Sequence, residues 1–153
     1  MSRMRQPLIS ILICALLTGG AAFAAKKAIS PKELGGVPAS GPKPPFSPGI
    51  QVNNTLYVAG QVGRDLKTGQ IPQDFESEVK NALQNAGLVL KEAGFTFQDV
   101  VAVQVYLTDM DLFQRMNAIY ATFFNDPRPA RTTVGVAKLV AGARIEITIT
   151  AQK

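Results

Sequence analysis

The sequence predicts an α+β two-layer sandwich, in which two helices cover one face of a mixed sheet in the order β-β-α-β-α-β-β. Three observations lead to this prediction. Two segments carry apolar residues at helical spacing, five others have the composition or alternation of strands, and the last strand alternates isoleucine with polar residues. Because two amphipathic helices cover only one face of such a sheet, the other face is left uncovered.

The first two strands form a predicted hairpin. Residues 50–52 and 55–59 are rich in β-branched and apolar side chains, and they flank the pair Asn53-Asn54. Asparagine tolerates the backbone conformations of a tight turn, which favours a hairpin at this point. Residues 65–69 (DLKTG) then form a turn-rich loop that leads to Ile71.

The first helix is predicted to begin after Asp74. An aspartate at this position caps free backbone N–H groups, and Glu76 and Glu78 lie in the first turn, where the helix dipole favours acidic groups. Gly94 ends the helix, because glycine adopts the left-handed conformation of a helix C-terminus. The apolar positions at helical spacing are Val79, Leu83, Ala86, Leu90 and Ala93.

The second half of the chain is predicted as strand, helix and two strands. Residues 101–107 alternate valine and leucine with Ala102, Gln104 and Tyr106, as in a strand. A helix begins at Asp111 and ends before Pro127 and Pro129, since proline cannot continue a helix. Its apolar positions are Phe113, Met116, Tyr120 and Phe123/Phe124. Residues 131–137 and 144–151 form the last two strands, separated by a turn at 138–143.

The uncovered face of the sheet is predicted to be half polar. If Ile145, Ile147 and Ile149 point toward the helices, then Glu146, Thr148 and Thr150 point the other way. Ala102, Gln104 and Tyr106 of the middle strand belong to the same mixed face. A face that is too apolar for solvent and too polar for a core is typical of an oligomer interface or a shared cleft.

The N-terminus has the layout of a secretory signal peptide. Arg3 and Arg5 precede an apolar run over residues 7–17, and Ala22-Phe23-Ala24 forms an A-x-A cleavage site. We therefore expect cleavage after Ala24 and a periplasmic or secreted protein. The domain organisation expected is a signal peptide over residues 1–24, a Pro/Gly-rich extended lead-in over 25–49 and a folded domain over 50–153.

Composition excludes several classes of function. The chain has no histidine, and its one cysteine, Cys14, lies within the signal peptide. A Ser-His-Asp triad, a Cys-His pair and a His-based zinc site are therefore excluded. The processed chain of 129 residues carries a net charge of +3 without a dense basic cluster, so neither nucleic acid nor, once the signal is removed, a membrane is an expected partner.

Six short segments follow one another in the order found in a known family. They are residues 57–61 (YVAGQ), 67–69 (KTG), 103–111 (VQVYLTDMD), 116–120 (MNAIY), 129–132 (PART) and 144–147 (RIEI). The most specific is P-A-R-[ST], which is followed about fifteen residues later by I-E-I. Over residues 42–151 the chain resembles the RidA (YjgF) family.

This resemblance implies a chorismate-mutase-like fold and a homotrimer with clefts between its subunits. It also implies an enzyme, a hydrolase similar to 2-iminobutanoate/2-iminopropanoate deaminase, which converts small 2-imino acids to 2-keto acids and ammonia. The family uses no metal and no organic cofactor, so none is expected here. The resemblance agrees with the absence of histidine and cysteine from the processed chain.

The resemblance also suggests which residues form the site. Arg131 matches an arginine that binds the substrate carboxylate, a task suited to a planar and permanently charged guanidinium. Glu146 matches a glutamate that helps to place the attacking water. The substrate-binding positions implied are Phe46, Ala59, Gly60, Gln61, Asn117 and Thr133.

Three of these positions depart from the pattern of active deaminases. Phe46 stands in place of a tyrosine, Ala59 in place of a serine, and Thr133 in place of a frequent cysteine. The first two changes remove hydroxyl groups, each worth about 1–3 kcal/mol when it bonds a substrate or transition state. An alternative function is therefore a non-catalytic trimer that binds small carboxylates or keto acids, or a holdase-like interaction protein. Ribonuclease activity is disfavoured, because no histidine is present to serve as acid or base.

Overall fold

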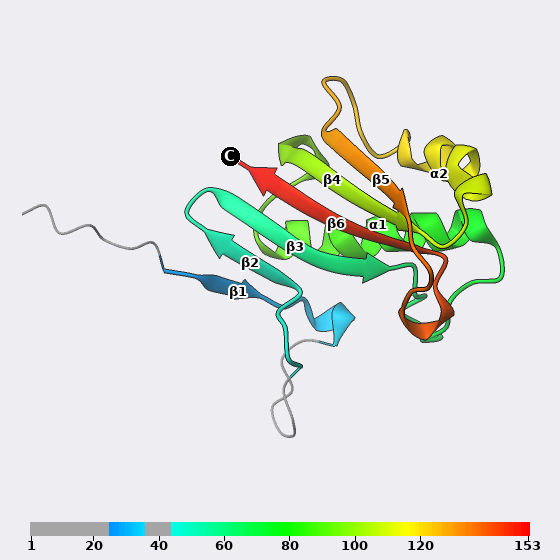
Figure 1. Cartoon of the computed structure of the whole chain (residues 1–153). Coiled ribbons are helices and arrows are strands. Elements are labelled where there is room, and N and C mark those ends of the chain that lie inside the picture. The colour runs from blue at the N-terminus through cyan, green and yellow to red at the C-terminus, as the bar shows by residue number, and fades with distance from the viewer. Residues whose placement is uncertain (1–24, 36–43) are drawn as a thin grey trace, which may run out of the picture.

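A six-stranded mixed sheet forms the centre of the molecule, in the spatial order β1-β2-β3-β6-β4-β5 (Figure 1). The computed structural model describes residues 25–35 and 44–153. The strands are β1 (Lys27–Ile29), β2 (Gly49–Val52), β3 (Thr55–Val62), β4 (Val100–Leu107), β5 (Ala130–Gly135) and β6 (Ile145–Gln152). Neighbouring strands are antiparallel except for β4 and β5, which are parallel and joined by a helical crossover. The predicted α+β two-layer architecture is confirmed.

Both helices lie on the same side of this sheet, with α1 running behind it in Figure 1. The helices are α1 (Phe75–Glu92) and α2 (Phe113–Tyr120). As predicted, Asp74 caps α1 by accepting a hydrogen bond of 2.8 Å from the Ser77 N–H. Gly94 follows the helix with a φ of +78°, and the Phe95 N–H donates back to the Leu90 carbonyl, which is the bonding pattern of a glycine C-cap.

The pairing register confirms the predicted division of the sheet into two faces, except at the start of β4. There the pairing with β6 shifts between Val100 and Ala102, so that Val100 is buried and Val101, predicted on the apolar face, is 45% exposed. Ile145, Ile147 and Ile149 are buried against the helices, and the core continues through the buried apolar side of α1. Gln104 lies opposite Thr148 and Tyr106 opposite Glu146, so these four residues share the uncovered face. On this face Gln104 accepts hydrogen bonds from the Thr148 and Tyr106 hydroxyls, at 3.0 and 3.1 Å.

The segment expected as an extended lead-in contains an additional strand. Strand β1 pairs with β2, and its Ile29 is 2% exposed and belongs to the main hydrophobic core. One buried isoleucine in a three-residue strand leaves no periodicity that a sequence pattern can reveal. The predicted signal peptide, residues 1–24, lies outside the described residues.

The second helix is shorter than predicted. A 3₁₀ turn over Met110–Leu112 precedes it, capped by the Asp109 side chain, and α2 begins at Phe113 instead of Asp111. Phe123 and Phe124 lie beyond its end, where both rings pack edge-on against Phe97. These aromatic contacts fix the return of the chain toward β5. Within the described residues, no helix is long and apolar enough to cross a membrane.

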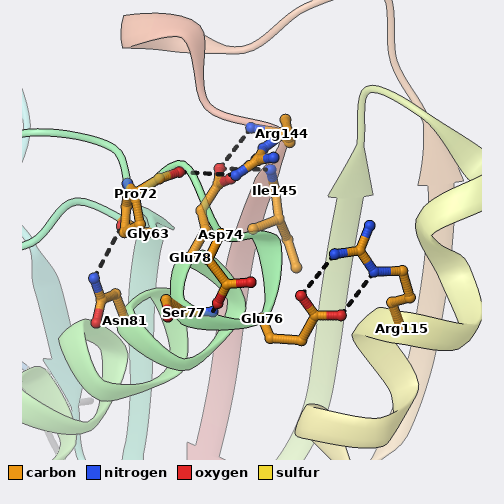
Figure 2. A network of polar contacts seen from close by, with 10 residues as sticks. All are labelled: Gly63, Pro72, Asp74, Glu76, Ser77, Glu78, Asn81, Arg115, Arg144 and Ile145. Carbon is orange, nitrogen blue, oxygen red and sulfur yellow. Dashed lines mark hydrogen bonds and ion pairs between the residues drawn. The ribbon is translucent and has the colours of Figure 1, made fainter.

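An ion pair joins the two helices. Arg115 of α2 donates two hydrogen bonds of 2.7 Å to the Glu76 carboxylate at the start of α1 (Figure 2). The Arg115 guanidinium lowers the pKa of Glu76 from its ordinary value near 4.5 to about 2. Both partners are solvent-exposed, so the contact orients α2 on α1 more than it stabilises the core.

Candidate functional site

Arg131 lies on β5 with its side chain against α2. Its guanidinium carbon is 4.5 Å from the centre of the Tyr120 ring and 5.6 Å from that of Phe113, and Nη1 is 4.0 Å from the Met116 sulfur. No carboxylate of the described residues forms an ion pair with it. The aromatic faces stabilise and orient the cation without neutralising it, which leaves its N–H groups available for a ligand.

A hollow of about 420 Å³ opens beside Arg131. Asn117 and Tyr120 of α2 line it together with Arg128 and Pro129 from the segment before β5. The structure therefore brings two predicted site residues, Arg131 and Asn117, into one cavity. Burial raises the pKa of the Tyr120 hydroxyl, while the positive charges of Arg131 and Arg128 act in the opposite direction.

Thr133 lies on the same face of β5 as Arg131, two residues further along. Val103 lies opposite Arg131 and Val105 opposite Thr133, so both point toward the helices. The Thr133 hydroxyl is buried and has no hydrogen-bond partner in the described structure. Thr133 does not line the hollow beside Arg131, so its role in the site stays a prediction.

Glu146 lies in a different place, on the uncovered face of β6. Its carboxylate rests directly against Gly60 of β3, where a β-carbon would overlap it. At this point β3 bulges between Val58 and Gln61 in its pairing with β6. The bulge and the missing side chain together admit the carboxylate, so Gly60 and Glu146, both predicted site residues, are brought into contact.

The remaining predicted residues surround Gly60. Gln61 is 8% exposed and donates a hydrogen bond of 3.1 Å to the Ala59 carbonyl. Phe46, Gly60 and Gln61 line a second hollow of about 430 Å³. Phe46 itself is 63% exposed. Ala59 does not line this hollow, and the binding roles of these four residues stay predictions.

Within one chain the two predicted catalytic residues lie on opposite faces of the sheet. Arg131 shares the helix-covered face with Val103, whereas Glu146 shares the uncovered face with Tyr106. Glu146 does not line the hollow beside Arg131. A small ligand therefore cannot contact both side chains of the same subunit.

Sequence reasoning missed a buried ion pair that positions Glu146. Glu78 was interpreted only as an acid in the first turn of α1, but its side chain is fully buried. It accepts hydrogen bonds of 2.6 Å from the Arg144 N–H and Nε, and one of 3.3 Å from the Ile145 N–H (Figure 2). Arg144 also donates to the Pro72 carbonyl at 2.8 Å. Glu78 thus holds the start of β6, immediately before Glu146.

Two asparagines of α1 were also missed. The Asn85 side chain donates hydrogen bonds of 3.1 Å to the carbonyls of Val62 and Arg64, and Asn81 donates to the Gly63 carbonyl at 3.3 Å. They satisfy backbone groups where β3 leaves the sheet, just after Gln61. The only sequence signal for them is that polar side chains interrupt the apolar stripe of the helix. Asn85 lies among buried alanine and leucine residues of that stripe.

The chemistry available is that of one strong cation and one carboxylate, held on rigid strands. A cation of this kind suits the carboxylate of a small acid, and Glu146 can accept a hydrogen bond from water. In the part of the chain that the structure describes, no group of three acidic, histidine or cysteine side chains is arranged to hold a metal ion.

Comparisons with known proteins identify the family. The profile described as endoribonuclease L-PSP (Ribonuc_L-PSP) matches residues 38–153. A "RutC family protein" of Sulfurisphaera tokodaii is 42% identical over 115 residues, which are 73% of this chain and 92% of that protein. The "2-iminobutanoate/2-iminopropanoate deaminase" of mouse, Mus musculus, is 45% identical over 104 residues, which are 67% of this chain and 77% of the mouse protein.

The fold matches solved structures of the same group. The YjgF gene product of E. coli superimposes with a TM-score of 0.73 and 31% identity, covering 83% of this chain and 98% of the E. coli chain. Sequence profile, relatives and fold therefore agree. The chain belongs to the RidA (YjgF, L-PSP) family.

Proposed function

We propose that this protein hydrolyses small 2-imino acids to 2-keto acids and ammonia, at a site shared between subunits of a homotrimer. The observation that carries the proposal is Arg131, a cation without an ion-pair partner among the described residues, which two aromatic rings hold at a hollow. The relative from mouse that is named an imine deaminase supports the same reaction class.

The reaction needs one water molecule and no redox partner. Arg131 binds the carboxylate of the 2-imino acid through paired N–H donors. The Glu146 carboxylate accepts a hydrogen bond from the water that attacks the imine carbon. The C–O bond forms, the C–N bond breaks, and the nitrogen leaves as ammonia after taking up the protons that the water releases.

A second copy of the chain completes this site. Arg131 and Glu146 lie on opposite faces of one sheet, so a ligand that touches both needs Arg131 of one copy and Glu146 of another. β5 is an edge strand, which places Arg131 where a neighbouring subunit can approach. Such a contact joins unlike surfaces, and the family resemblance implies that it closes as a ring of three subunits.

The uncovered sheet face supports this assembly. Tyr57 and Val134 lie on it at 53% and 41% exposure, on either side of the polar group formed by Gln104 and Thr148. Exposed apolar side chains around a polar centre are typical of a surface that a partner covers. Light scattering should therefore return three times the mass of the processed chain, and a monomer mass would contradict the shared site.

The activity is tested directly on the purified, processed protein. An amino-acid oxidase generates 2-iminopropanoate in the cuvette, and semicarbazide competes for the imine, so an active protein lowers the rate of semicarbazone formation. Native protein should do so, and Glu146→Gln should not. The exposed α1 variant Lys80→Gln serves as a charge-changing control outside the site. A native rate equal to that of buffer would refute the deaminase proposal.

Binding by Arg131 is tested with the product analogue 2-oxobutyrate. Arg131→Ala should abolish the binding heat, and Arg131→Lys should weaken it, because lysine keeps the charge but loses the planar pair of donors. Equal affinity in native protein and both variants would remove Arg131 from the site.

A non-catalytic carboxylate-binding trimer is the second candidate, and Phe46 and Ala59 favour it, because both lack the hydroxyl of active relatives. The variant Phe46→Tyr with Ala59→Ser should raise kcat about tenfold to a hundredfold, which corresponds to about 1.4–2.8 kcal/mol of transition-state stabilisation. KM should change less, since Arg131 grips a carboxylate that alters little during the reaction. A folded trimeric variant without any gain would favour the binding function.

We also propose that the protein acts outside the cytoplasm, in the periplasm or after secretion. The basic, apolar and A-x-A segments over residues 1–24 support this location. The processed chain has no cysteine, so export exposes no thiol to oxidation.

A further inference from the structure

The hollow beside Arg131 contains a second guanidinium for which the proposed reaction has no use. Arg128 lines the same hollow, three residues before Arg131. The Arg128 side chain is 58% exposed. Its one ion-pair contact in the described structure is with Asp126, at 3.6 Å, and the Asp126 side chain is 89% exposed. An exposed pair at that distance contributes little, so Arg128 is effectively available.

The charge of the hollow is unbalanced. Its lining residues are Asn117, Tyr120, Ala121, Arg128, Pro129 and Arg131, which include two cations and no acid. Both cations share the lining of this hollow with Tyr120, whose ring centre is 4.5 Å from the Arg131 guanidinium carbon. A ligand with one carboxylate neutralises Arg131 and leaves the positive charge of Arg128 without a counter-charge.

We propose that this hollow selects 2-imino acids that carry a second carboxylate, with the α-carboxylate on Arg131 and the side-chain carboxylate on Arg128. The inference rests on the proposed deaminase function and names its preferred substrate class, the imino derivatives of four- and five-carbon dicarboxylic acids. Their 2-oxo products carry the same two carboxylates and bind in the same way.

The two arginines differ in burial and in the contacts that hold them, as binding of two different carboxylates requires. Arg131 is half-buried and stacked on Tyr120, so it is rigid and suits the α-carboxylate that all 2-imino acids share. Arg128 is exposed, and Pro129 restricts the backbone that separates it from β5. Its long side chain can follow a variable group whose length differs between substrates.

Substrate preference is measured as a ratio, so that general losses of activity cancel. The ratio is kcat/KM for 2-iminoglutarate divided by kcat/KM for 2-iminopropanoate, both generated in place by amino-acid oxidases. We expect native protein to favour the dicarboxylate and Arg128→Gln to lower the ratio about twofold to fivefold, the range of an exposed guanidinium–carboxylate pair. Lys80→Gln removes the same charge outside the hollow and should leave the ratio unchanged. A ratio that is equal in native protein and Arg128→Gln would overturn the inference.

Binding separates this inference from the proposed reaction. Calorimetry should show tighter binding of 2-oxoglutarate than of 2-oxobutyrate, with the difference lost in Arg128→Gln and reduced in high salt. If no imino acid is hydrolysed but this difference is found, the deaminase proposal fails and the dicarboxylate site stands. If 2-iminopropanoate is hydrolysed but the two oxo acids bind equally, the reaction stands and the dicarboxylate preference is wrong.

Discussion

Replacing Glu78 by glutamine tests how β6, and with it Glu146, is held in place. Each carboxylate oxygen of Glu78 accepts from at least one N–H group of Arg144 or Ile145, and the side chain is fully buried. Glutamine has nearly the same shape, but its amide NH₂ replaces one of these acceptors. In Glu78→Gln a donor must therefore face a donor, and the charge of Arg144 loses its partner.

The expected cost follows from the surroundings of Arg144. Breaking a buried ion pair by removing one partner costs about 3–5 kcal/mol. The Arg144 side chain is 33% exposed and keeps its hydrogen bond to the Pro72 carbonyl, so water and this carbonyl recover part of the loss. We therefore expect Glu78→Gln to lower the free energy of unfolding by about 2–3 kcal/mol, or Tm by about 8–12 °C for a domain of this size.

Urea unfolding at pH 7 measures this loss, at one fixed protein concentration because the proposed association would also contribute to stability. Glu92→Gln is the matched control, since it removes an exposed acid at the end of the same helix. Imine hydrolysis by the folded fraction should fall as well, because Glu146 is two residues beyond Arg144. A loss below about 1 kcal/mol, or one no larger than in Glu92→Gln, would refute the assignment of Glu78 as the anchor of β6.

Three further predictions follow from other parts of the chain. Gly60→Ala should lower kcat for imine hydrolysis at least tenfold in a folded protein, because the added methyl group displaces the Glu146 carboxylate; native kcat would contradict this. The depressed pKa of Glu76, about 2 against about 4.5, stabilises the fold above pH 4.5 and is lost as the pH falls toward 2. Glu76→Gln should therefore flatten the dependence of urea midpoint on pH between 5 and 2, and identical slopes would exclude this contribution. Intact mass spectrometry of exported protein should find cleavage after Ala24, whereas a species that keeps residues 1–24 would refute the signal peptide.

The order of elements and the faces of the main strands could be predicted from local patterns. Isoleucines at every second position of β6 indicated which side of that strand is buried. Asp74 and Gly94 indicated where α1 begins and ends. These signals are readable because each depends on a few neighbouring residues. The motifs around Arg131 and Glu146 identified the family in the same way.

What the sequence by itself could not determine are relations between distant segments. Alternation gives the face of a residue relative to its own strand, so the opposition of Arg131 and Glu146 appears only once β4, β5 and β6 are paired in register. The local sequence around Glu78 is compatible with an exposed helix acid and with a buried anchor. The choice depends on Arg144, which lies 66 residues later in the chain and packs against Glu78 in the fold. Only the tertiary structure decided these points, because the free energy of a buried charge depends on the partner that the fold brings to it.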